Sequence, residues 1–487
     1  MKISPLLSRA FIALTVFALT PADAQDINWD RPVSPETQQS DFKSLYEGLQ
    51  SAHANLYVHR PKAEYDALYK NMEAGFTASM TLLETQIAFQ KFTAFGNVAH
   101  ARLDFPGEVY QAYRDDGGRT FPIYLRIADG RAYVGEDYSG VDGVSRGDEI
   151  LKLNGAPISE WLDRTAAHIS ADTPYIAHSL LEFSFPRYLW VELGEVEEFD
   201  LAIRTDAGVK ALTVSARTKP EQEAAALAQT PAFVLDGDRR VAKMLDDDLA
   251  YLRPGPFYNI EDTTAFWDNT RFIAFIEGAF GEFMEAGAEK LIIDLRENPG
   301  GDSSFSDHMI AWIADEPFRF ASAFLIKSSD EAAASNQARI DGSPEAAQGV
   351  SGLFAKKYAE VPRGEIFDFD IPYAEPRDGE RFDGDVYVLI NRHTYSNAVN
   401  VASVFQDYGW GVIAGEKTSD MATTYGAMET FELPLTGLQV GFPKAHIIRA
   451  SGDKKSDGVT PDWTIKTPIA ATQNDDVLQA LISRLND

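Results

Sequence analysis

The sequence contains no cysteine, which excludes disulfide bonds, thiolate metal sites and a lipid-modified cysteine at the start of a mature chain. It also contains no His-Glu-x-x-His, calcium-loop or Gly-rich phosphate-binding motif. Basic residues are scarce: 44 Lys and Arg stand against 74 Asp and Glu, a formal net charge of −30. Such an acidic surface argues against nucleic acid or an anionic membrane as a partner. We therefore expect no metal, no cofactor and no nucleic-acid partner.

Residues 1–24 have the features of a cleaved export signal. Lys2 and Arg9 give a basic start, residues 10–19 form an apolar core, and Ala22-Asp-Ala24 is a small-x-small cleavage site. The apolar core is too short to span a bilayer, so we expect no stable membrane anchor. We predict a periplasmic or secreted protein; the sequence carries no signal for an oligomeric state.

Three further regions follow, separated by changes in apolar period. The apolar period is helical from Asp41 to about Phe95, behind a polar arm at 25–40, which predicts an N-terminal helical domain at residues 25–104. Residues 105–217 alternate between apolar and polar side chains, as β-strands do. An aromatic, helical-looking insertion interrupts this pattern at 159–197. Residues 233–487 alternate strands with helices, which predicts an α/β domain.

Two stretches lack a clear period. Residues 221–229 are polar and rich in alanine, and we interpret them as a linker. Residues 328–380 have no strong period, and we expect a flexible loop or lid there.

Two strand-to-turn junctions in the α/β region carry the chemistry. The apolar run 291–295 leads into Arg-Glu-Asn-Pro-Gly300-Gly301, and the apolar run 386–390 leads to Ser396 at the start of a helix. Ser396 is the candidate nucleophile, and backbone N–H groups of Gly300, Gly301 and Asn397 are candidate oxyanion donors. This layout favours an acyl-transfer hydrolase. The alternative is that Ser396 only caps a helix and Asn-Pro-Gly-Gly is only a turn.

The two junctions resemble the signature of the tail-specific, carboxyl-terminal processing serine proteases, a group that includes the tricorn core protease. The resemblance covers about residues 233–466. It rests on Leu291-Ile-Ile-Asp-Leu-Arg-Glu-Asn-Pro-Gly-Gly301, Thr394-Tyr-Ser-Asn-Ala398, Gly415-Glu-Lys-Thr418 and Gly458-Val-Thr-Pro-Asp462. It implies a crotonase-like ββα spiral for the catalytic domain, and a peptide or protein substrate. The segment 147–155 is similar to the core of a PDZ-type module, which binds extended peptide.

One position departs from that family's pattern and puts the catalytic base in doubt. The processing proteases use a Lys base, and Met421 occupies the corresponding position. The tricorn-like branch uses an N-terminal His instead, and the stretch Phe95-Gly-Asn-Val-Ala-His100 is similar to the segment that carries it. We therefore assign His100 as the base. His393, Lys417 or the absence of any competent base remain alternatives.

A carboxylate usually orients such a His. The tricorn-like relatives place theirs just before the Gly-Val-x-Pro-Asp motif, which implies Asp457, with Asp453 as the alternative. The sequence thus predicts an exported serine endopeptidase that acts through an acyl-enzyme. Two alternatives remain: a catalytically inactive peptide- or ligand-binding protein on the same scaffold, and a hydrolase of non-peptide esters or amides.

Overall fold

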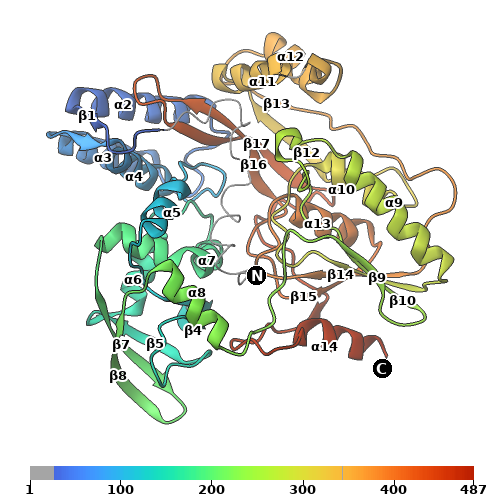
Figure 1. The fold of residues 1–487 in the computed structure, drawn as a ribbon. Coiled ribbons are helices and arrows are strands. Elements are labelled where there is room, and N and C mark those ends of the chain that lie inside the picture. The colour runs from blue at the N-terminus through green and yellow to red at the C-terminus, as the bar shows by residue number, and fades with distance from the viewer. Residues whose placement is uncertain (1–26, 343, 487) are drawn as a thin grey trace.

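The computed structural model describes residues 27–342 and 344–486, so the predicted export signal lies outside the described residues. The chain is a mixed α/β protein with one large parallel sheet, two antiparallel sheets and a short strand pair (Figure 1). In the part of the chain described, no helix is long and apolar enough to cross a membrane.

The N-terminal region is helical, as its period predicts. It contains β1 (Pro32–Val33), α2 (Pro35–Ala52), α3 (Lys62–Gly75), β2 (Met80–Thr81) and α4 (Leu82–Ala94). Thr81 and Glu84 form a capping box that begins α4. The apolar face of α2, which includes Phe42 and Leu45, shares one buried cluster with Phe324 and Phe442 of an antiparallel sheet. This region therefore does not have a core of its own.

A second region, residues 105–217, is built around the antiparallel order β3-β4-β5-β7-β8, and β6 pairs with β5. Its elements are α5 (Gly107–Asp115), β3 (Ile123–Ala128), β4 (Arg131–Asp137), β5 (Glu149–Leu153), β6 (Ala156–Pro157), α6 (Ile158–Ala166), α7 (Pro174–Leu193), β7 (Glu198–Thr205) and β8 (Gly208–Ser215). The interruption at 159–197 is helical, as expected. The expectation of a linker at 221–229 is wrong, because α8 (Lys219–Ala228) occupies it behind a Thr218–Glu221 capping box.

The α/β region is organised by a six-stranded sheet in the order β18-β15-β14-β11-β10-β9. Its strands are β9 (Val241–Met244), β10 (Leu249–Arg253), β11 (Lys290–Asp294), β14 (Asp385–Ile390), β15 (Val412–Gly415) and β18 (Trp463–Thr464). All neighbours pair in parallel except β9, which is antiparallel to β10. The order of the strands across the sheet follows their order in the chain, so each new strand is added at the same edge.

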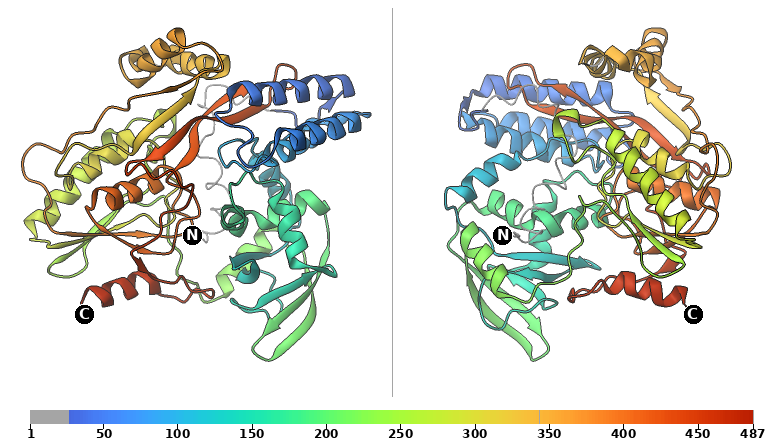
Figure 2. Two further views of the ribbon diagram at one scale, coloured as in Figure 1. Left: turned by 180° about the vertical axis from the view of Figure 1, so that it is seen from behind. Right: turned by 45° about the vertical axis from the view of Figure 1, so that its right-hand side comes forward.

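Helices cover both faces of the parallel sheet. The 3-10 turn η2 (Thr263–Ala265) precedes α9 (Thr270–Glu285), which packs with α10 (Ser303–Ile310) and α13 (Asn397–Tyr408) on one face. The C-terminal α14 (Asp476–Leu485) packs on the other face through Val477 and Leu481. Figure 2 shows that this sheet and the β3–β8 sheet lie on opposite sides of the molecule.

A four-stranded antiparallel sheet in the order β13-β12-β17-β16 connects the α/β region to the N-terminal helices. It comprises β12 (Ala321–Lys327), β13 (Ile366–Asp368), β16 (Thr424–Glu432) and β17 (Gln439–Arg449). The expected flexible loop or lid at 328–380 is wrong. That stretch contains α11 (Asp330–Gly342), the short η3 (Pro344–Gln348), α12 (Val350–Glu360) and β13, and Phe354 packs into the shared N-terminal cluster.

Candidate functional site

The two strand-to-turn junctions meet at one edge of the parallel sheet. β11 and β14 are parallel neighbours with Asp294 opposite Leu389, so their carboxyl ends emerge together. The loops that follow, residues 295–301 and 391–396, are joined by the Tyr395 N–H, which donates to the Asn298 carbonyl at 2.9 Å. The pairing of these strands therefore places the Gly-Gly loop beside Ser396.

Ser396 does not have the backbone conformation of an ordinary helix cap. Its φ and ψ are 52° and −126°, and its hydroxyl makes no capping hydrogen bond to α13. A non-glycine residue held there costs about 1–3 kcal/mol of backbone strain. The interpretation of Ser396 as a mere cap is therefore wrong.

The three predicted oxyanion donors lie together, but they are not equivalent. A Cβ at Gly300 would lie 2.7 Å from the Asn397 nitrogen and 2.8 Å from the Ser396 Cβ, so only glycine allows this approach. The Gly300 N–H already donates to Asn298 Oδ1 at 2.9 Å. No residue in the described part of the chain accepts a hydrogen bond from the N–H of Gly301 or from that of Asn397. Gly301 and Asn397 are thus the better placed pair.

His100 contacts Tyr395, the residue before Ser396, and no described hydrogen bond joins His100 to Ser396. The His100 ring stacks on that of Tyr395, with centroids 6.2 Å apart. The turn that carries it is fixed by the Ala99 N–H donating to Asp172 at 2.9 Å and by backbone pairing of Arg102 with Gly441. His100 is buried, and no described residue hydrogen-bonds to its Nδ1.

Asp420 is a site residue that the sequence did not reveal. Its carboxylate accepts the Ser396 N–H at 2.6 Å and the Met421 N–H at 2.8 Å. Burial raises the pKa of Asp420, while the charge of His100 and the two N–H donors act in the opposite direction. Asp420 therefore couples electrostatically to His100 and holds the backbone of Ser396.

The structure gives Asp457 different partners from those expected. Lys417 and Lys455 both donate to its carboxylate, the latter at 2.8 Å, and within the described residues it makes no contact with His100. Among the described residues, the carboxylate of Asp453, the alternative, accepts only the backbone N–H of Lys455. The orienting role of Asp457 stays a prediction that these contacts do not support.

Neither Met421, which occupies the position of the usual Lys base, nor the alternatives Lys417 and His393 are suited to accept a proton. Met421 packs in the apolar core of the β3–β8 region. Lys417 is bound to Asp457. His393 Nδ1 lies 2.9 Å from Glu297, and its Nε2 lies 3.1 Å from Glu182. Burial would lower the pKa of His393, but the two carboxylates outweigh it and raise the pKa to about 9.

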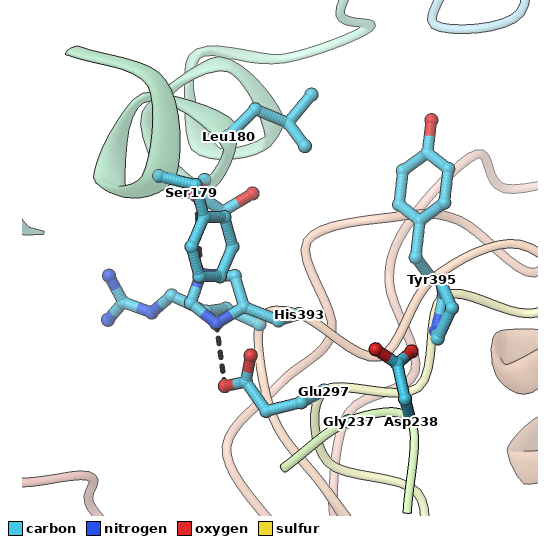
Figure 3. A pocket seen from close by; sticks show the side chains of 10 residues that line it. Ser179, Leu180, Gly237, Asp238, Glu297, His393 and Tyr395 are labelled. Carbon is cyan, nitrogen blue, oxygen red and sulfur yellow. Dashed lines mark hydrogen bonds and ion pairs between the residues drawn. The ribbon is translucent and has the colours of Figure 1, made fainter. Parts of the chain in front are cut away.

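A small pocket opens next to these junctions (Figure 3). Leu180 and Phe183 of α7 line it on one side, and Pro299 and Tyr395 come from the two loops. The His393–Glu297 pair forms part of its wall, and Figure 3 shows the contact between them. Pro299 and Tyr395 directly precede Gly300 and Ser396 in the chain. The pocket could therefore hold a side chain of a ligand bound at these two residues.

Part of the chain is similar to a known protein family. Residues 265–465 match Peptidase family S41. No curated protein matches the chain in sequence. Among solved structures, mature CPAF complexed with lactacystin is 16% identical with a TM-score of 0.62, covering 93% of this chain and 97% of that chain. This likeness shows a shared fold.

Two further structures are more distant. The photosystem II D1 C-terminal processing protease is 16% identical with a TM-score of 0.42, covering 88% of this chain and 93% of that chain. The tricorn protease is 12% identical with a TM-score of 0.40, covering 93% of this chain and 37% of that chain.

Proposed function

We propose that this chain, whose residues 265–465 match Peptidase family S41, is an exported serine endopeptidase with Ser396 as nucleophile and His100 as base. One observation carries the proposal. The strained Ser396 lies next to Tyr395, on which His100 stacks, and its N–H is held by the buried Asp420. Strain at a nucleophile, a neighbouring imidazole and a buried carboxylate together are typical of acyl-transfer sites.

In the proposed reaction, His100 takes the proton of the Ser396 hydroxyl while the oxygen attacks the peptide carbonyl carbon. The N–H groups of Gly301 and Asn397 stabilise the negative charge that develops on the carbonyl oxygen. His100 then gives the proton to the leaving amine, and an acyl-enzyme on Ser396 remains. Water, deprotonated by His100, releases the acid product and restores the hydroxyl.

In this mechanism, Asp420 takes the electrostatic role that the sequence assigned to Asp457. A carboxylate near the imidazole stabilises the imidazolium that forms during proton transfer. Asp420 is buried and interacts with the His100 charge, whereas Asp457 is bound by two lysines. We therefore propose Asp420 as the carboxylate that supports His100.

A pair of variants tests this assignment. Asp420→Asn is expected to lower kcat by about 100-fold, since the imidazolium loses its nearby charge. Asp457→Asn is the matched control. We expect its kcat to stay within about twofold of wild type, because the substitution breaks only half-exposed ion pairs. The kcat of both variants on one fluorogenic peptide shows whether Asp420 or Asp457 supports His100. If Asp457→Asn has the larger effect, the original assignment stands and the Asp420 role is wrong.

The activity itself is tested by incubating the protein with an unfolded protein substrate and identifying the products by mass spectrometry. We expect internal cleavage that a fluorophosphonate blocks.

A second candidate function, peptide binding without cleavage, is favoured by Met421, which replaces the family's usual base with a buried apolar side chain. That function predicts capture of intact substrate, with no new termini and no labelling of Ser396.

Three finer assignments belong to the same proposal. The one-directional growth of the parallel sheet supports a crotonase-like spiral for residues 233–487. The antiparallel β3–β8 sheet, with α6 packed on it, supports a PDZ-like module for residues 105–217. The basic start, apolar core and cleavage site of residues 1–24 support export to the periplasm or beyond.

A further inference from the structure

His393 lies between two segments that come together only in the folded chain. It sits in the loop after β14, three residues before the proposed nucleophile. Its Nδ1 contacts Glu297 Oε1 at 2.9 Å, in the loop that leads to Gly300 and Gly301. Its Nε2 contacts the carboxylate of Glu182 at 3.1 Å and the carbonyl of Ser179 at 3.2 Å, both on α7. The imidazole therefore connects the donor loop to α7.

The partners of the ring define its protonation state. Carboxylates and a backbone carbonyl accept hydrogen bonds and cannot donate them at neutral pH. Both ring nitrogens must therefore carry hydrogen, which only the imidazolium cation provides. A pKa of His393 of about 9 and a pKa of Glu182 of about 2 agree with this geometry.

The charged groups around the ring are themselves paired. Glu182 also accepts from Arg126 of β3 and from Arg392, each at 2.9 Å. Arg392 in turn pairs with Glu416 after β15. Asp238 lines the same pocket as His393 (Figure 3).

The donor loop needs such a contact because its backbone is strained. Glu297 has a φ of 60°, a conformation that non-glycine residues rarely adopt. Asn391 holds the same residue from the second loop, with its Nδ2 2.9 Å from Glu297 Oε1. A cation fixed between Glu297 and α7 keeps the loop in this strained state.

We propose that His393 is a positioning residue, which as an imidazolium clamps Glu297 and thereby holds the Gly301 N–H in place for the oxyanion of the reaction on Ser396. This role rests on the proposed function. It also gives the enzyme a pH dependence. The clamp is intact while His393 is protonated, and it is lost as pH rises through about 9. A deprotonated ring nitrogen would then face an acceptor.

Kinetics of His393→Gln give the first test. The variant is expected to lower kcat by about 10- to 100-fold with little change in KM, because misplaced donors weaken only the transition state. It is also expected to remove the alkaline limb that wild type shows near pH 9. The charge-conserving His393→Lys should recover part of kcat. His308→Gln, an exposed histidine on α10, is the matched control.

Hydrogen exchange of the donor loop gives a second test that does not depend on activity. The amides of Arg296, Glu297, Asn298 and Gly300 are hydrogen-bonded, so their exchange reports opening of the loop. After correction for intrinsic rates, we expect faster exchange in His393→Gln at pH 7.5, and in wild type at pH 10 relative to pH 7.5.

The two tests separate the clamp from the proposed function. Unchanged exchange in both comparisons overturns the clamp, whether or not the protein cleaves peptides. An active His393→Gln with the kcat and alkaline limb of wild type overturns it too. If wild type shows no cleavage and no fluorophosphonate labelling, the proposed function fails, and the exchange measurement still decides the clamp. If His393→Gln does not fold, the wild-type comparison between the two pH values decides it.

Discussion

Ser396→Ala is expected to abolish peptide hydrolysis, lowering kcat by about 10⁴-fold or more, because no acyl-enzyme forms without the hydroxyl. The protein is expected to keep its fold. The Ser396 hydroxyl makes no capping bond to α13, and the hydrogen bond to Asp420 comes from the backbone N–H, which alanine retains. We therefore expect a change in unfolding free energy of less than about 1 kcal/mol.

The measurement is turnover of a fluorogenic peptide by purified wild type and variant, alongside thermal unfolding of both. Ser403→Ala is the matched control. Ser403 lies on α13 and is buried, and within the described part of the chain its hydroxyl donates only to the Asn400 carbonyl. A folded Ser396→Ala with the rate of wild type would remove Ser396 from the mechanism.

His100→Gln is the second change for which we expect a very large effect, again about 10⁴-fold in kcat. Glutamine has a similar size and remains neutral, so it removes the proton acceptor while filling most of the space beside Tyr395. The turn itself is held by backbone contacts of Ala99 and Arg102, which the substitution does not touch.

Kinetics above and below neutral pH check this prediction, with His308→Gln as an exposed control. Recovery of activity in His100→Gly upon addition of imidazole would support a direct role in proton transfer. A His100→Gln enzyme that turns over within about tenfold of wild type would show that another group is the base.

The sequence predicted those parts of the site that depend on short local signals. The apolar runs at 291–295 and 386–390 became the neighbouring strands β11 and β14, within one residue of the expected bounds. The glycines after the first run and the serine after the second were brought together because parallel strands end at the same edge. Local period and turn residues were sufficient for this.

Residues whose roles depend on distant contacts were not predicted. Asp420 meets Ser396 only because the loop after β15 folds back on the β14–α13 junction, and nothing in the sequence around Asp420 marks it. The ion pair of His393 with Glu297 joins positions 96 residues apart, and its partner Glu182 is more distant still in the chain, so a motif could not show that its ring is charged. His393 was instead considered as a base, which its partners make unsuitable.

Secondary structure was missed where the sequence is polar. The helices α8 and α11 bury few residues, so they lack the apolar stripe by which a helix is recognised. Capping and contacts with neighbouring elements stabilise them: Thr218 and Glu221 begin α8, and Asn336 of α11 donates to the Ser351 carbonyl.

The central claim is that His100 activates Ser396, and the rate of fluorophosphonate labelling tests it most directly. The probe reacts with an activated serine hydroxyl without requiring a known substrate. We predict that wild type is labelled at Ser396, as located by mass spectrometry of the digested protein. We also predict that His100→Gln is labelled at least about 100-fold more slowly. Labelling at a different residue, or equal rates in wild type and His100→Gln, would contradict the account.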